Sequence, residues 1–157
     1  MATPRAERLA VPAEYGSPSA LVAWADVDRK LAEAHHYWLA TVRPDGRPHV
    51  VPVDGLWFDG RLRFGGVAST VWQRNMAHDP RVSVHLDDSV AAVIVEGTCA
   101  VEVPDRAGAE GLVAASTAKY GYAPPVEAYL SGVWTLSPAR VLAWTDLTAD
   151  ATRFVFP

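Results

Sequence analysis

The chain has 157 residues, of which 50% are hydrophobic and 20% are charged, and its formal net charge is −4. This length fits one domain of about 100–200 residues, and this composition excludes a disordered or fibrous chain. The 14 basic residues form no basic stripe, so we expect neither a nucleic acid nor a membrane as a partner. The first residues contain no apolar secretion signal, so we expect a cytoplasmic protein.

Cysteine and histidine usage argues against disulfide and metal chemistry. Cys99 is the single cysteine, and its apolar surroundings predict a buried, inert thiol. The five histidines lack metal-binding spacings, and no serine lies in a hydrolase nucleophile motif. We therefore expect no metal site and assign no catalytic side chain.

The beginning of the chain predicts an arm followed by a helix. Residues 1–16 contain prolines and a glycine among residues of mixed polarity, which is typical of a flexible N-terminal arm. Residues 17–157 then form the single predicted domain. Ser17 and Pro18 resemble an N-cap and a first-turn proline, and apolar residues recur at helical spacing up to Leu31.

Short strands joined by tight turns follow this helix. Asp-Gly pairs supply the turn positions that hairpins need, and Gly97 within a long strand predicts a bulge. Further helices are predicted near residues 69–78 and 105–119, with a short turn after Pro124 and Pro125. The predicted strands are Tyr37–Val42, Arg47–Val53, Leu56–Phe58, Arg61–Phe64, a strand around residues 82–86, Val90–Val103, Val133–Leu136 and Arg140–Thr145. This pattern favours a mainly β, antiparallel barrel with peripheral helices.

The start of the predicted helix at 69–78 has the residues of an anion-binding site. Gly65 and Gly66 precede Ser69 and Thr70, so free N–H groups and two hydroxyls meet the positive end of a helix dipole. An ordinary capped helix start has the same residues. The local pattern alone leaves both interpretations open.

Three motifs in this order resemble a known family. They are "A-T-x-x-x-D-G-x-P" at residues 40–48, "R-N-x-x-x-D-P-R" at 74–81 and "V-E-G" at 95–97. Over residues 35–145 the chain resembles the pyridoxamine 5'-phosphate oxidase-like, flavin-binding split-barrel family. The resemblance implies a split antiparallel β-barrel and an obligate homodimer. It also implies two cofactor sites at the dimer interface, each holding flavin mononucleotide or the deazaflavin coenzyme F-420.

The resemblance also implies a set of cofactor-binding residues. One group borders the isoalloxazine ring, a second anchors the phosphate at the helix start, and a tryptophan comes from the other subunit. One departure is Trp72, which occupies a position where relatives often carry a phosphate-binding lysine. The residues expected on this basis are Val51, Pro52, Val53, Phe64, Gly65, Ser69, Thr70, Trp72, Arg74, Asn75 and Trp134.

The expected function is that of a flavin- or F-420-dependent oxidoreductase. Such a cofactor performs the hydride transfer itself, which fits the lack of a catalytic side-chain constellation. The small-molecule substrate cannot be named from the sequence. The alternative is a non-enzymatic protein of the same fold that binds a flavin, a haem or another planar ligand, because Trp72 removes a charge and adds a stacking surface. A third interpretation of Trp72 alone is core packing beside Met76.

Overall fold

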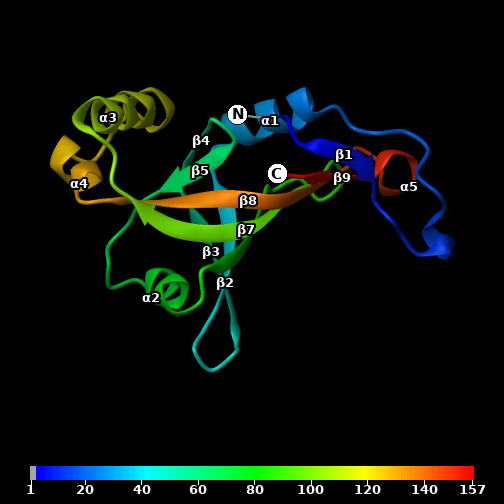
Figure 1. Ribbon diagram of the computed structural model, residues 1–157, viewed down its shortest axis with the longest axis horizontal. Coiled ribbons are helices and arrows are strands. Elements are labelled where there is room, and N and C mark those ends of the chain that lie inside the picture. Colours follow the sequence, from blue (N-terminus) through cyan, green and yellow to red (C-terminus); the bar gives the residue numbers. More distant parts are fainter. Residues whose placement is uncertain (1–2) are drawn as a thin grey trace.

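The structure is a computed structural model that describes residues 3–157 and is organised around one antiparallel sheet (Figure 1). The strands are β1 (Arg5–Arg8), β2 (Tyr37–Val42), β3 (Pro48–Val53), β4 (Leu56–Phe58), β5 (Arg61–Phe64), β6 (Arg81–His85), β7 (Val93–Glu102), β8 (Val133–Ala143) and β9 (Thr152–Val155). Their order is β1-β9-β8-β7-β6-β2-β3, and the β4–β5 hairpin joins β8 through β5. Within residues 3–157 no pairing links β3 to β4, which leaves the barrel split there. The mainly β fold and the split antiparallel barrel predicted from the sequence are thereby confirmed.

The helices lie around this sheet (Figure 1). They are α1 (Trp24–Glu33), α2 (Val71–His78), α3 (Arg106–Tyr120), α4 (Val126–Leu130) and α5 (Leu147–Asp150), with a 3-10 turn at Ala13–Tyr15. Figure 1 shows α3 and α4 side by side at one end of the molecule and α5 beside β1 and β9 at the other. In the part of the chain that the structure describes, no helix has the length and apolar character needed to cross a membrane.

Tight turns set the register of the hairpins. Gly46 has a φ of 84°, and Asp59 and Gly60 have φ values of 50° and 64°. Two consecutive positive φ values are typical of a type I′ turn, whose twist matches that of the flanking strands. These turns lie where the Asp-Gly pairs predict them.

The bulge predicted at Gly97 is present, and it corrects the prediction of two last strands. The register between β7 and β8 shifts next to Gly97, which lies opposite Pro138. A proline has no N–H to donate, but at a bulge the ladder does not require one. The strands predicted as Val133–Leu136 and Arg140–Thr145 therefore run on through Ser137 and Pro138 as the single strand β8.

Two predictions for the N-terminal part differ from the structure. Residues 5–8 of the expected flexible arm form β1, which pairs with β9 and carries an ion pair from Glu7 to Arg153 at 2.6 Å. The unpaired backbone groups at the edge of β9 supply the partners for this strand. The first long helix begins at Trp24 and not near Ser17, because the amides of Ser19 and Ala20 donate to the carbonyl of Ala149. The division into an arm and one domain stays a prediction.

The main core lies between α1, α2 and the sheet. Side chains alternate along β2, where Tyr37, Leu39 and Thr41 are buried. Val27 and Leu31 of α1 cover the same core. A second, smaller cluster of Leu56, Leu112 and Val133 holds α3 against the sheet. The position of α3 relative to the barrel therefore depends on few apolar contacts.

Replacing Gly97 by alanine is expected to lower the free energy of unfolding by about 1–3 kcal/mol, the usual cost of overpacking. An added Cβ would lie 2.1 Å from the carbonyl oxygen of Ser137. Gly111→Ala in α3 is the matched control, because nothing lies within 4 Å of its added Cβ. This control should gain about 0.5–1 kcal/mol from helix propensity. Urea unfolding of both variants measures the effects, and equal stabilities would contradict the close approach at the bulge.

Candidate functional site

A cavity of about 440 Å³ lies where the β3–β4 turn, the segment after β5, and the helices α3 and α4 meet. One wall comes from the barrel and from the start of α2, and the other comes from α3 and the segment that follows it. The lining residues are Pro52, Val53, Asp54, Gly55, Leu56, Arg63, Phe64, Gly65, Gly66, Thr70, Trp72, Leu112, Ser116, Tyr120, Tyr122, Pro124, Tyr129 and Val133. Ligand cavities commonly measure about 300–1,000 Å³ and combine apolar walls with a few polar groups. This cavity fits that description.

The barrel-side wall contains six of the eleven residues predicted to bind a cofactor. They are Pro52, Val53, Phe64, Gly65, Thr70 and Trp72. The strand β3 supplies the first two, the end of β5 and its following loop supply the next two, and the start of α2 supplies the last two. These six residues, expected from the family resemblance, therefore lie together on one wall of the cavity.

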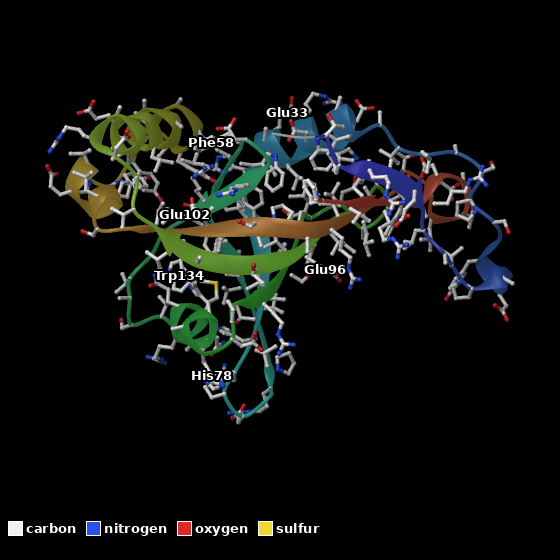
Figure 2. The ribbon with its side chains drawn as sticks, in the orientation of Figure 1. Glu33, Phe58, His78, Glu96, Glu102 and Trp134 are labelled. Atoms are coloured by element: carbon white, nitrogen blue, oxygen red, sulfur yellow. The ribbon has the colours of Figure 1, made fainter. Side chains whose placement is uncertain are left out.

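The other five predicted residues do not line the cavity. Val51 packs against the main core, and Ser69 is exposed next to the start of α2. Arg74 is exposed and donates from Nη1 to the Ser69 carbonyl at 2.8 Å. Trp134 lies at the α2 and α4 end of the molecule, opposite Phe64 on β5 (Figure 2). Its side chain packs partly buried against the main core.

The fifth of these residues, Asn75, has a structural partner. Its side chain is buried, and Nδ2 donates to Oγ1 of Thr41 at 2.9 Å. A buried amide without a partner would cost about 1–3 kcal/mol, so this bond stabilises the contact of α2 with β2. Asn75 therefore holds the helix in place beside the cavity.

Trp72 belongs both to the core and to the cavity wall. Only 8% of its surface is exposed, and its ring lies 5.6 Å from the ring of Phe64. A Cβ on Gly66 would lie 2.7 Å from Cζ2 of Trp72, so the glycine is needed for this close packing. The indole thus fills the space beside Gly66 that a longer, flexible lysine would leave open.

Thr70 is the one polar side chain in the described residues with a buried atom that lacks a partner. It occupies the N-cap position of α2, but its Oγ1 forms no capping hydrogen bond. Buried hydroxyl groups are normally bonded, so an unpaired one next to a cavity points to a missing acceptor or donor. The positive end of the α2 dipole also lies at Thr70, because this residue is the N-cap of the helix.

The α3 side of the cavity was missed by the sequence analysis. Tyr120, Tyr122 and Tyr129 line it, together with Ser116. The only sequence signal was the presence of these tyrosines within ten residues, beginning at the last residue of α3. Tyr122 donates to Oδ2 of Asp54 at 2.9 Å, which connects this wall to the β3–β4 turn.

Gly55 is held by two consecutive residues at the end of α3. The Tyr120 hydroxyl lies 2.8 Å from both the N–H and the carbonyl oxygen of Gly55. Nζ of Lys119 donates to the same carbonyl at 2.8 Å and to the Tyr37 hydroxyl at 3.1 Å. A larger residue at position 55 would require Leu62 to shift, because an added Cβ would lie 2.9 Å from its Cδ1 atom. These bonds fix the separation of the two cavity walls.

Burial changes the acid–base properties of this contact. Burial lowers the pKa of Lys119 to about 8. The negative charge of Asp54 has the opposite, smaller effect on this pKa. Burial likewise raises the pKa of Tyr120 and Tyr37 above the usual tyrosine range. Both phenols therefore stay neutral at physiological pH. Cys99, as expected, is buried, which raises the pKa of its thiol to about 12.

No group of three or more histidine, cysteine or acidic side chains within residues 3–157 has the arrangement of a metal site. The cavity instead combines aromatic and apolar walls with exposed backbone, neutral hydroxyl groups and two charged residues, Asp54 and Arg63. Fold and cavity together define a split-barrel protein with a cavity beside the start of α2.

Residues 24–145 match the family model described as pyridoxamine 5'-phosphate oxidase, and the chain belongs to this family. This match covers more than half of the chain, and it confirms the resemblance noted in the sequence motifs. No curated protein matches the chain.

Solved structures of the same fold include proteins with different printed roles. A conserved hypothetical protein from Mycobacterium tuberculosis has a TM-score of 0.67 at 21% identity, over 84% of this chain and 89% of that one. An F-420 reductase has a TM-score of 0.55 at 28% identity, over 73% and 94%. A heme-binding protein from Mycobacterium smegmatis has a TM-score of 0.60 at 23% identity, over 82% and 56%.

Lys119→Met is expected to change how stability depends on pH. The pKa of Lys119 is about 8 in the folded protein against 10.5 for the free side chain. Between about pH 7 and pH 9 the unfolded chain therefore holds more protons, so the stability of the wild type should rise with pH relative to the variant. Urea unfolding across this range measures it. Lys30→Met, which removes the other lysine of the chain, should keep the wild-type slope; identical slopes in all three proteins would contradict the burial of Lys119.

Proposed function

We propose that the protein binds a flavin or the deazaflavin coenzyme F-420 in this cavity and transfers hydride to or from a small molecule. The observation that carries the proposal is the unpartnered Oγ1 of Thr70 at the start of α2, next to an aromatic wall. Family membership and the F-420 reductase among the similar structures support it. When bound, the cofactor supplies the hydride chemistry, and the protein supplies position, polarity and exclusion of water.

The barrel-side wall fits the ring system of such a cofactor. Pro52, Val53, Phe64 and Trp72 give apolar surface, and no atom lies within 4 Å of the place where a Cβ of Gly65 would stand. The backbone of Gly65 is therefore open to close approach by a planar ligand. These residues would hold the ring and shield it from water.

The anion-binding part of the cavity contains few charges. Trp72 stands at the family's lysine position, Arg74 is directed to the Ser69 carbonyl, and Arg63 is the only cationic residue among the lining residues. Neutral donors therefore dominate near Thr70. Such a site suits a phosphodiester with one negative charge, as in F-420, better than the doubly charged phosphomonoester of flavin mononucleotide. We accordingly favour F-420 over flavin mononucleotide.

Replacing Thr70 by valine should weaken cofactor binding by about 0.5–1.5 kcal/mol, because it removes the hydroxyl and keeps the shape. Fluorescence titration of the purified protein with F-420 and with flavin mononucleotide measures both affinities. Thr117→Val, at an exposed position on α3 outside the cavity, is the matched control and should bind as the wild type does. Failure of the wild type to bind either compound would refute the proposal.

A second candidate function is storage or transport of a planar ligand without catalysis. The specific observation that favours it is Trp72, which offers a stacking surface where a cation is usual. The heme-binding protein among the similar structures is a second support. The two candidates differ in one property: an oxidoreductase reoxidises its bound, reduced cofactor when a substrate is added, and a carrier protein does not.

We also propose that a second copy of the chain packs on the outer face of the β2–β3 hairpin. This face carries six apolar side chains, of which Val42 and Val50 are 40% and 50% exposed. An apolar surface of this kind on a monomer often marks an interface. Pro52 belongs both to this face and to the cavity wall, so a second copy would border the cofactor. The side chains concerned are Trp38, Ala40, Val42, Pro48, Val50 and Pro52.

Val50→Glu should convert the proposed dimer into a monomer, because it introduces a charge into an interface of more than ~1,000 Å². Sedimentation velocity at micromolar concentration shows the change. Val90→Glu adds the same charge at a residue that is 73% exposed between β6 and β7, and it should leave the dimer intact. A monomeric wild type would rule out the shared site.

A further inference from the structure

The two walls of the cavity differ in chemistry. The barrel-side wall near α2 offers backbone and neutral donors, whereas the α3 side offers three phenol rings, and the carboxylate of Asp54 on the β3–β4 turn is hydrogen-bonded to one of them, Tyr122. Tyr120 and Tyr129 are fixed by packing against the Leu56, Leu112 and Val133 cluster. The ring of Tyr122 lies 6.3 Å from that of Tyr120. The proposed cofactor occupies the first wall, so the second wall is left for another molecule.

Asp54 has no strong cationic partner. Its side chain is 43% exposed, and Oδ2 accepts the hydrogen bond from neutral Tyr122. Nε2 of His36 lies 3.5 Å from Oδ1, and an imidazole carries a charge only when it is protonated. Among residues 3–157 no lysine or arginine forms an ion pair with this carboxylate. Its negative charge is therefore available at the cavity wall.

The two cations near the cavity are directed elsewhere. The guanidinium of Arg63 lies 4.0 Å above the Phe58 ring, and Nη1 donates to the Phe58 carbonyl. Phe58 lies outside the cavity, near Glu102 and the α3 end of the molecule (Figure 2). Lys119 does not line the cavity, and its Nζ is bonded to Gly55 and Tyr37 behind the wall. Lys119 weakens the field of Asp54 but does not pair with it.

The negative charge of Asp54 raises the pKa values of two of the phenols. Its hydrogen bond and its charge raise the pKa of Tyr122, and its charge adds to the burial that raises the pKa of Tyr120. A negative charge on these rings is therefore disfavoured. Neutral phenol faces attract cations through the ring quadrupole, and a nearby carboxylate adds to that attraction.

We propose that the α3 side of the cavity is the substrate compartment of the proposed oxidoreductase, and that it selects molecules with a positively charged nitrogen on an apolar or aromatic body. Asp54 supplies the countercharge, and Tyr120, Tyr122 and Tyr129 supply the ring faces. The role as a substrate compartment rests on the proposed function, whereas the preference for cations rests on these four residues alone.

The preference is tested with three soluble compounds that each carry one phenyl ring and differ in charge: benzyltrimethylammonium, benzyl alcohol and benzoate. Titration of the ¹⁵N-labelled full chain, followed through the backbone amide signals of Gly55 and Gly121, gives both the affinity and the place of binding. Benzyltrimethylammonium should bind about tenfold more tightly than benzyl alcohol, and benzoate should bind more weakly than either.

Two variants separate charge from ring contacts. Asp54→Asn keeps an acceptor for Tyr122 but removes the charge, so it should lower the affinity for benzyltrimethylammonium by about tenfold. Tyr122→Leu removes a ring and should lower the same affinity with Asp54 present. Asp59→Asn removes an equal charge at an exposed turn with a φ of 50°, which asparagine tolerates, and should change nothing. Melting temperatures confirm that each variant is folded.

Three outcomes overturn the inference: no binding of benzyltrimethylammonium, equal binding of benzoate, or an unchanged affinity in Asp54→Asn. Cofactor binding is measured separately by fluorescence in the same proteins. A wild type that binds cofactor without preferring cations refutes the compartment and leaves the proposed function standing. A wild type that prefers cations but binds no cofactor refutes the proposed function, and the cation site remains.

Discussion

The hydrogen bonds between the end of α3 and the backbone of Gly55 connect the two halves of this molecule. The barrel and the α3–α4 pair share only a small apolar cluster, and the cavity exists because the Tyr120 hydroxyl and the Lys119 amine hold the β3–β4 turn. A lysine amine that is half-buried loses hydration, which is reflected in its lowered pKa. Partial desolvation of the Lys119 amine is thus the electrostatic cost of the hydrogen bonds that set the distance between the two cavity walls.

The neutral wall itself depends on a close approach between Trp72 and Gly66. A tryptophan can occupy this helix position only because position 66 has no side chain. The indole then contributes to the core and to the cavity wall at the same time, which bears out its interpretation as core packing, while its role as a stacking surface for a ligand stays a prediction. The consequence is a cavity whose polar contacts near α2 come from a hydroxyl group and backbone donors, with little positive charge.

Much of the fold could be predicted because it follows from local patterns. Alternating side chains give the strands, Asp-Gly pairs give the hairpin turns, and Gly97 marks the bulge. The barrel-side wall follows from the same strands. The α3 wall could not be predicted, because the contact of Tyr120 with Gly55 spans 65 residues and no periodic pattern records it. The protein partners of Arg74 and Asn75, the Ser69 carbonyl and the Thr41 hydroxyl, could likewise not be read from the sequence, and their expected contact with a cofactor stays a prediction.

The two ends of the main strand order, β1 and β3, are unsuited to pairing with another strand. At one edge, β1 has only four residues, and charged side chains occupy three of them. At the other edge, Pro48 and Pro52 of β3 have no N–H to offer to an incoming strand. Exposed strand edges promote aggregation unless they are blocked in such ways. Edge-to-edge assembly of copies of this chain into fibres is therefore disfavoured at β1 and β3.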